Sequence, residues 1–195
     1  MKLGILAVQG DFEAHAKMLA RLGVDWSYVK RPDDLQGVDA LILPGGESTT
    51  FLKFLEEGKF LEALGRLPSE GKPLFGTCAG AILLARDVGN PPQPSLGLLD
   101  ITVARNAYGR QIASRVTQGP CELKDGPLEM VFIRAPVIER VGESVEVLAW
   151  CDSQPVFVRQ GLVMATTFHP ELTTDATVHE YFLRLVSTAF ANVRG

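Results

Sequence analysis

Short apolar runs alternate with amphipathic segments through the first half of the chain. Leu3–Val8 is almost uniformly apolar and predicts a buried strand. The segment 11–23 that follows places Ala16 and Leu19 on one helical face and ends at Gly23. Further strands are expected at 26–30, 40–46 and 72–76, one or two helices at 48–67, and another helix at 79–87. Apolar strands that alternate with helices predict a parallel sheet covered on both faces.

A Pro-rich stretch, 89–97, separates this half from a second half with a different pattern. The stretch is either a linker or a surface loop within one domain. Beyond it, short β-rich pieces occur at 98–105, 110–116, 129–136, 145–150, 155–161 and 162–170. We expect these pieces to add antiparallel strands to the sheet, and residues 175–191 to form a last helix. A single domain over residues 1–195 accommodates all of these elements.

The composition narrows the class of protein. Of the 195 residues, 46% are apolar and 22% charged, as in ordinary globular proteins. The net charge of −4, with no block of Lys or Arg, argues against nucleic acid as a partner. No apolar segment approaches the ~20 residues of a membrane span, and the N-terminus lacks a signal peptide, so we expect a cytoplasmic protein. Three widely spaced cysteines argue against a disulfide framework or a cysteine metal site.

One cysteine, Cys78, stands between glycines in the motif GTCAG (76–80), where a strand is expected to hand over to a helix. This spacing is typical of a nucleophile elbow. A sharp strand-to-helix turn strains the nucleophile, and glycine lets the neighbouring backbone approach closely. The alternative is that Cys78 is simply a small buried hydrophobic residue.

His169 is the expected base for Cys78. Pro170 favours an extended His169, and in extended chain Glu171 points to the same side as His169. A carboxylate in that position fixes the imidazole tautomer, which is the logic of a Cys–His–Glu triad. The alternative is a capping histidine before a turn. The other two histidines lie inside predicted helices and are expected at the helix surface or boundary: His15 and His179.

A third motif, LPGGEST (43–49), leads from a predicted strand into a predicted helix, with Ser48 as the expected N-cap. Gly45 and Gly46 would expose backbone N–H groups opposite that of Ala79, and such a pair stabilises a developing oxyanion. The alternative is a tight strand-to-helix turn with no chemical role.

Together, the PGG loop, the G-x-C-x-G elbow and the late H-P-E motif resemble a class I (triad-type) glutamine amidotransferase. The motifs LAVQGD, LPGGEST, FGTCAGAILLA, ARNAYGRQ, VFIRAP and FHPELT are similar, in order, to those of the glutaminase subunits of pyridoxal 5′-phosphate synthase. This resemblance covers nearly the whole chain. It implies a three-layer, doubly wound, flavodoxin-like mixed sheet with helices on both faces.

The resemblance also implies a mechanism. Cys78 attacks the carboxamide of L-glutamine, His169 acts as general base, and Glu171 orients His169. The backbone N–H groups of Gly46 and Ala79 form the oxyanion hole. Six residues are implied in glutamine binding: Gly46, Glu47, Ser48, Arg105, Ile133 and Arg134. An arginine suits this role because a guanidinium binds an α-carboxylate bidentately. Without their motifs, Arg105 and Arg134 would instead be predicted to be solvated surface charges.

The implied product, ammonia, passes to a separate synthase subunit that makes pyridoxal 5′-phosphate from ribose 5-phosphate and glyceraldehyde 3-phosphate. That cofactor is the partner's product, so no cofactor or metal is expected in this chain. Gln9, after the first strand, is assigned to contact with the partner or activation by it. The alternative for this loop is structural, with Asp11 as a helix cap. Two other functions stay open: a glutaminase subunit of another synthase, as in histidine biosynthesis, or an inert regulatory subunit of the same fold.

Overall fold

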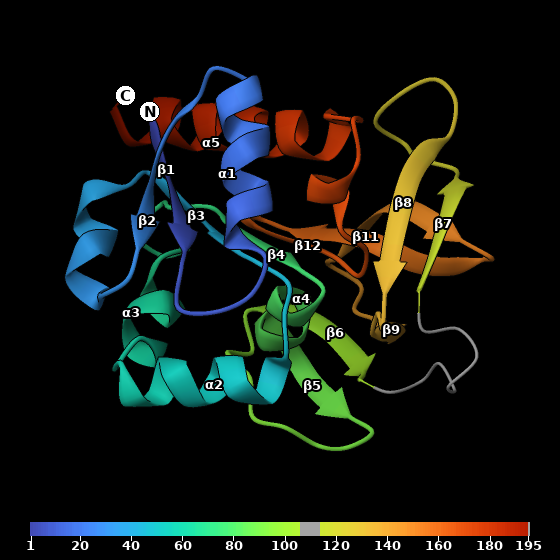
Figure 1. Ribbon diagram of the computed structural model, residues 1–195, viewed down its shortest axis with the longest axis horizontal. Coiled ribbons are helices and arrows are strands. Elements are labelled where there is room, and N and C mark those ends of the chain that lie inside the picture. Colours follow the sequence, from blue (N-terminus) through green and yellow to red (C-terminus); the bar gives the residue numbers. More distant parts are fainter. Residues whose placement is uncertain (106–113, 195) are drawn as a thin grey trace.

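The computed structural model of the chain describes residues 1–105 and 114–194, and a seven-stranded mixed sheet lies at its centre (Figure 1). Its strands are β1 (Lys2–Leu6), β2 (Asp25–Val29), β3 (Ala40–Leu43), β4 (Leu74–Thr77), β10 (Glu146–Cys151), β11 (Gln154–Gln160) and β12 (Val163–Thr166). They lie in the order β10-β11-β12-β4-β3-β1-β2. From β12 to β2 all neighbours are parallel, whereas β11 is antiparallel to both β10 and β12. The parallel part has the flavodoxin-like strand order, which confirms the expected fold.

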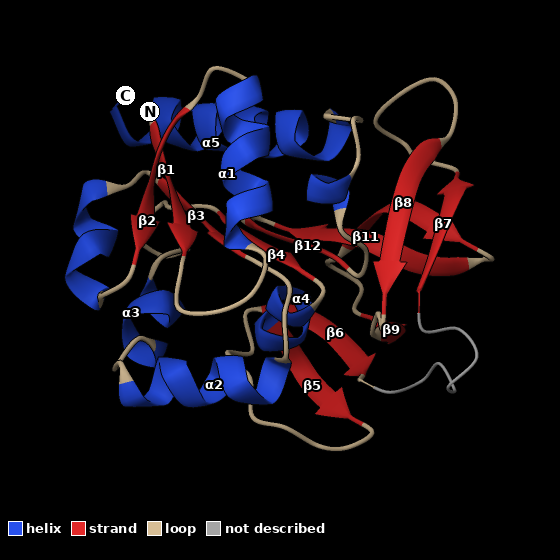
Figure 2. Ribbon diagram, viewed as in Figure 1, coloured by secondary structure: helices blue, strands red, loops and turns tan. Residues whose placement is uncertain are grey.

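Helices cover both faces of this sheet (Figure 2). They are α1 (Phe12–Arg21), α2 (Ser48–Glu57), α3 (Leu61–Arg66), α4 (Ala79–Leu84) and α5 (Thr177–Arg194), with 3-10 turns η1 (Pro32–Gly37) and η2 (Pro170–Leu172). The helices α1 and α5 pack on one face through residues such as Leu19 and Phe182. On the other face α2, α3 and α4 bury residues such as Phe51 and Leu83. In α1 and α2 the buried side chains recur with the helical period, so each of these helices turns one apolar stripe to the sheet, whereas all six residues of α4 are buried.

Two small sheets lie beside the main one. In the first, β5 (Ala85–Gly89), β6 (Leu99–Ala104) and β9 (Val137–Val141) lie in the order β5-β6-β9; in the second, β7 (Ser114–Gly119) pairs with β8 (Leu128–Ile133). The expectation that every β-rich piece adds an antiparallel strand to the main sheet is therefore wrong in part. Only β10 and β11 do so. All four residues of β12 are buried, as in a central parallel strand, whereas residues of β8 alternate between fully and partly buried.

One helix boundary differs from the predicted one. The helix expected over 79–87 ends at Leu84, and the chain continues as β5. The carbonyls of Leu83, Leu84 and Ala85 accept hydrogen bonds from amides of the loop after β5, so they are not available to a longer helix. The segment 48–67, expected to form one or two helices, forms two, α2 and α3, separated by a turn in which Lys59 has a φ of 58°.

The fold gathers the motifs at one edge of the sheet. Because parallel strands end at the same edge, the loops after β1, β3, β4 and β12 meet there, and open α/β sheets bind their ligands in this crevice. Residues 106–111, the NAYGRQ part of one motif, lie outside the described residues. Within the described parts of the chain, no helix combines the length and apolarity needed to cross a membrane.

Candidate active site

Cys78 occupies a sharp turn between the last residue of β4 and the first residue of α4. Its φ of 48° and ψ of −101° lie outside the regions that side-chain-bearing residues normally adopt. The Cys78 amide donates to the Thr166 carbonyl of β12, at 2.8 Å, which ties the turn to the neighbouring strand. Such a strained residue persists only where its surroundings hold it, and such residues cluster at functional sites.

The glycines on either side explain how the chain tolerates this turn. A Cβ on Gly80 would lie 2.1 Å from the Leu43 carbonyl oxygen of β3. A Cβ on Gly76 would lie 2.6 Å from the Gly80 carbonyl carbon. Both clashes involve backbone, which cannot move aside cheaply. The G-x-C-x-G spacing is thus required by the packing of α4 against β3 and β4.

His169 and Glu171 lie beside this turn. The ring of His169 is buried, and its Nδ1 lies 2.7 Å from Glu171 Oε1. The contact has a different geometry from the one expected, because Pro170–Leu172 forms the 3-10 turn η2 instead of extended chain. The turn curls Glu171 back onto the imidazole. Nδ1–H therefore donates to the carboxylate, which leaves Nε2 for the thiol.

The pKa of His169 is raised to about 10. Burial works to lower this pKa, but hydrogen bonds with Cys78 and Glu171 and the negative charge of both partners outweigh burial. Burial would likewise raise the pKa of Glu171, yet the interactions with His15 and His169 hold it below its usual value. These interactions favour a protonated imidazole beside an ionised Glu171 carboxylate.

A cavity of about 350 Å³ opens over Cys78 and His169. All six residues expected to bind glutamine line it: Gly46, Glu47, Ser48, Arg105, Ile133 and Arg134. Glu171 does not line the cavity and lies behind His169. Sequence reasoning did not assign the lining residues Asp11 and Ile82 to this site. Asp11 holds the N-cap position of α1 without a side-chain cap hydrogen bond, so its carboxylate is not committed to the helix.

Glu47, and not Ser48, is the N-cap of α2. Its carboxylate accepts from the amides of Thr49 and Thr50, at 3.0 and 2.7 Å. The hydrogen bond from the Thr50 side chain contributes most to lowering the pKa of Glu47 to about 2. The expected cap was wrong because Ser48 already belongs to the first turn, where its hydroxyl donates instead to Gln93 of the Pro-rich stretch, at 2.9 Å.

Arg105 reaches the same wall of the cavity from the end of β6. Its Nη2 donates to Thr49 Oγ1 at 2.7 Å and lies 3.5 Å from Glu47 Oε1. The side chain is only 13% exposed, so Arg105 is not a solvated surface charge. Arg134 is exposed and follows β8 with a φ of 44°. Two guanidinium groups thus border the cavity from separate strands.

The PGG loop is held by the loop after β1. The amide of Asp11 donates to the Gly45 carbonyl at 3.2 Å, and Gln9 Nε2 donates to the Glu47 carbonyl at 3.4 Å. A Cβ on Gly46, whose φ is 153°, would lie 2.4 Å from Gln9 Nε2. Gln9 therefore packs directly on the loop that carries one half of the expected oxyanion hole.

His15 and His179 are not at a surface or boundary, and that expectation was wrong. Both are buried, and His15 Nδ1 lies 3.2 Å from His179 Nε2. A helical period would have found them, because His15 lies four residues before buried Leu19 and His179 three before buried Phe182. Sequence reasoning missed them because it treated histidine as polar. Among the described residues, no group of three or more His, Cys, Asp or Glu side chains is arranged to hold a metal ion.

A flavodoxin-like sheet that carries a cysteine elbow after one strand and a His–x–Glu pair after the adjacent strand has the fold of a class I glutamine amidotransferase. Within this class, the chain belongs to the SNO glutamine amidotransferase family, whose model matches residues 5–188.

Curated relatives and solved structures agree with this assignment. The chain is 56% identical to the pyridoxal 5′-phosphate synthase subunit PdxT of Koribacter versatilis, over 95% of this chain and 96% of the relative. It is 51% identical to the subunit of the same name from Thermotoga maritima, over 95% of this chain and 100% of the relative. A crystal structure of a glutamine amidotransferase superposes with a TM-score of 0.89 at 49% identity, over 95% of this chain and 98% of the other. The structure of PurLQS from Thermotoga maritima shares the fold, with a TM-score of 0.68 at 17% identity, over 100% and 99% of the two chains.

Proposed function

We propose that the protein is the glutaminase subunit of a pyridoxal 5′-phosphate synthase, with residues 1–195 as one glutaminase domain. It hydrolyses L-glutamine to L-glutamate and ammonia and passes the ammonia to a separate synthase subunit. The observation that carries the proposal is one cavity lined by Cys78, His169 and the two arginines Arg105 and Arg134. Curated relatives named as PdxT support the choice of synthase.

The proposed reaction has four steps. The Cys78 thiolate attacks the carboxamide carbon, and the oxyanion that forms is held by the N–H groups of Gly46 and Ala79. The His169 imidazolium gives its proton to the leaving nitrogen, and ammonia departs, leaving a thioester on Cys78. His169 then takes a proton from water, and the resulting hydroxide attacks the thioester carbonyl. The tetrahedral intermediate then collapses and expels the Cys78 thiolate, and glutamate leaves after its new carboxyl group loses its proton to solvent, so that the thiolate and the His169 imidazolium are restored.

Glu171 makes this cycle possible by accepting a hydrogen bond from Nδ1–H of His169. This bond fixes the tautomer and stabilises the imidazolium that donates the proton. Arg105 and Arg134 bind the substrate α-carboxylate, and Glu47 and Asp11 offer anionic partners for its α-ammonium group. Ile133 and Ser48 complete the walls. A free amino acid, with both charges, matches this pattern of complementary groups.

Ammonia is protonated in water at neutral pH and is then no longer a nucleophile, so a direct transfer to the synthase is required. Gln9 supports such coupling, because it packs on the PGG loop and is itself only half-buried. A partner that contacts Gln9 can set the position of Gly46. We therefore assign Gln9 to partner contact and activation.

The test is glutamate release from L-glutamine by the purified chain, alone and with a pyridoxal 5′-phosphate synthase subunit. Cys78→Ala serves as the blank. Release that rises with the synthase and disappears in Cys78→Ala supports the reaction, the nucleophile and the partner together. No release with the synthase bound would overturn the vitamin B6 assignment, and release stimulated by the histidine-pathway synthase would favour the alternative glutaminase role. An inert regulatory subunit would release no glutamate with either synthase.

A further inference from the structure

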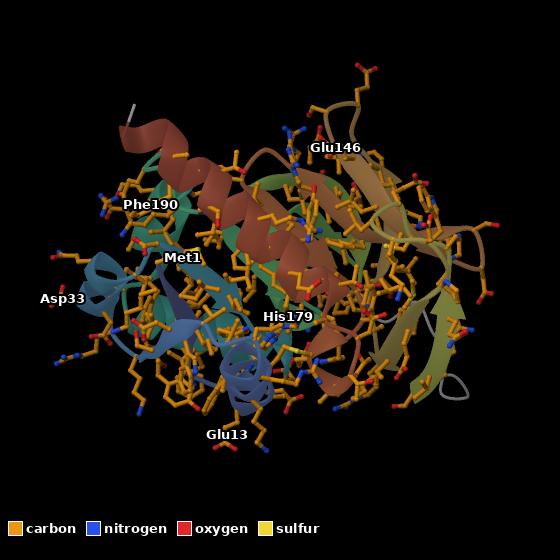
Figure 3. The ribbon with its side chains drawn as sticks, turned by 90° about the horizontal axis from the view of Figure 1, so that it is seen from above. Met1, Glu13, Asp33, Glu146, His179 and Phe190 are labelled. Carbon is orange, nitrogen blue, oxygen red and sulfur yellow. The ribbon has the colours of Figure 1, made fainter. Side chains whose placement is uncertain are left out.

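Behind the triad, on the side away from the cavity, lies a second group of polar side chains. Its members come from three separate elements, α1, β4 and α5, and all are buried: His15, Thr77 and His179. Figure 3 shows His179 projecting from α5 toward α1. Burying a polar side chain is costly unless it is hydrogen-bonded, so three such residues in contact with one another call for an explanation.

His15 is the centre of this group. Its Nε2 lies 3.2 Å from Thr77 Oγ1 and 3.5 Å from Glu171 Oε1, and its Nδ1 lies 3.2 Å from His179 Nε2. Glu171 belongs to the triad, and Thr77 is the residue before Cys78. One imidazole therefore touches both the carboxylate that orients the base and the strand end that carries the nucleophile.

The hydrogen-bond network assigns the tautomers. The negative Glu171 Oε1 lies 3.5 Å from His15 Nε2 and would repel a lone pair there, so it favours a proton on Nε2, which can then donate to Thr77 Oγ1 at 3.2 Å while it faces the carboxylate. His15 Nδ1 is then an acceptor, which requires His179 to donate through Nε2–H. His179 Nδ1 has no partner among the described residues, as expected for an unprotonated nitrogen. Burial, the largest effect on each, lowers the pKa of both histidines, so both rings are neutral.

Among the described residues, the contacts of the Glu171 carboxylate gather at one oxygen. Oε1 accepts a hydrogen bond from His169 Nδ1 at 2.7 Å and lies 3.5 Å from His15 Nε2. Oε2 has no partner among the described residues. A carboxylate held by one hydrogen bond can rotate about its own bonds. The polar N–H group of a second imidazole beside Oε1 restricts that freedom.

We propose that His15 is a positioning residue: its Nε2–H holds Glu171 Oε1 in line with His169 Nδ1, and His179 fixes the tautomer that makes this possible. The inference rests on the proposed function, since the readout of orientation is the glutaminase reaction. His15 touches no substrate. Its role is to keep the His169 ring aimed at Cys78 through every step of the cycle.

Two amide substitutions of the same residue separate this role from mere packing. In His15→Gln the side-chain amide reaches the place of Nε2 and can still donate to Glu171. In His15→Asn the amide reaches only the place of Nδ1, so the contact with His179 survives and the donor to Glu171 is lost. Both variants replace a buried imidazole with a smaller, neutral amide.

The measurement is glutamate release with the synthase subunit bound, at saturating and at limiting glutamine. For His15→Asn we expect kcat to fall on the order of 10- to 100-fold with KM little changed, because misaimed groups lose that much rate. For His15→Gln we expect kcat within about 3-fold of wild type. Equal kcat in the two folded variants would overturn the proposal, since only the Gln side chain keeps a donor beside Glu171.

A second readout does not depend on turnover. The Nδ1–H proton of His169, hydrogen-bonded to a carboxylate, gives a downfield proton NMR signal that Glu171→Gln serves to assign. We expect the signal in wild type and His15→Gln and its loss or broadening in His15→Asn. If the wild type releases no glutamate, the proposed function fails, and this signal alone decides the positioning role. An unchanged signal in His15→Asn would refute it.

If His15→Asn does not fold, as judged by thermal unfolding, Thr77→Val takes its place. This change removes the competing hydroxyl and leaves Glu171 as the acceptor for His15 Nε2–H. The expected kcat is then within about 3-fold of wild type. A fall of about 10-fold or more in a folded Thr77→Val protein would overturn the proposal, because His15 would then act through the hydroxyl and not through the carboxylate.

Discussion

At the scale of single residues, the two glycines of the elbow carry as much of the site as the cysteine they flank. Cys78 can hold its strained backbone only because β3 and α4 approach without side chains between them. The spacing of GTCAG made this turn predictable from sequence. The neutral state of His15 and His179 could not be predicted from local spacing, because it depends on partners brought in by other elements.

Substitution of two helical glycines by alanine should change the free energy of unfolding in opposite directions. In Gly80→Ala the new Cβ meets the Leu43 carbonyl, and we expect a loss of about 1–3 kcal/mol in the free energy of unfolding, with loss of glutamate release. In Gly65→Ala nothing lies within 4 Å of the new Cβ, and we expect a gain of about 0.5–1 kcal/mol. Urea unfolding followed by circular dichroism measures both. A stabilising Gly80→Ala would refute the close approach of β3 and α4.

His179 should make the fold sensitive to acid. Burial, and then the repulsion of His15, lowers its pKa from 6.5 to about 3. Below pH 6.5, His179 binds a proton in the unfolded chain but not in the folded chain, so the free energy of unfolding falls as the pH drops from 6.5 toward 3. At pH 5 the cost is about 2 kcal/mol.

The neutral variant His179→Gln tests this sensitivity. We expect its free energy of unfolding to change less between pH 7.5 and pH 5 than that of the wild type, by about 2 kcal/mol. Urea titrations at the two pH values give the four free energies required. The same change with pH in both proteins would show that His179 does not control the response.

At the scale of elements, hydrogen bonds from distant segments set helix boundaries that the local sequence pattern did not determine. The loop amides that bind the carbonyls of Leu83 to Ala85 end α4 early, and no propensity in that segment signals this. The strand β9 was missed because its charged Glu139 and Arg140 interrupt the apolar pattern. The short strands β1, β3 and β4 were found, because burial on both faces leaves a nearly continuous apolar run.

The Pro-rich stretch is hydrogen-bonded to the first turn of α2. Gln93 accepts from the Ser48 hydroxyl at 2.9 Å, at the wall of the cavity. We expect Gln93→Ala to raise KM for glutamine several-fold with kcat little changed. A double-mutant cycle with Ser48→Ala, read in kcat/KM, should give a coupling of about 1 kcal/mol. Additive effects of the two substitutions would show that the hydrogen bond does not shape the site.

At the scale of the whole molecule, the sheet separates two cores, and the candidate site lies at the edge where its parallel strands end. The order of strands followed from the resemblance of the motifs and was confirmed. The placement of β5-β6-β9 and β7-β8 outside the main sheet did not follow, because an edge strand in a small sheet carries the same alternating pattern as one in a large sheet.

Coupling to the synthase should depend on the loop after β1. In Gln9→Ala the packing on Gly46 and the hydrogen bond to the Glu47 carbonyl are lost, so we expect a smaller increase in glutamate release on adding the synthase. Gln36→Ala, an exposed position on η1, is the matched control and should respond like wild type. The measure is the ratio of rates with and without the synthase. An equal ratio in the two variants would remove Gln9 from the coupling.

The register between β4 and β12 has a consequence for how such a protein can diversify. Thr77 pairs with Thr166, and the next amide, that of Cys78, donates to Thr166 as well. The turn that carries Cys78 and the segment that leads to His169 therefore leave two adjacent strands, whose spacing in a sheet is about 4.8 Å. Loops that start elsewhere, such as the Pro-rich stretch, can change in length without altering this register. Such changes would reshape the mouth of the cavity while the origins of the two segments stay fixed.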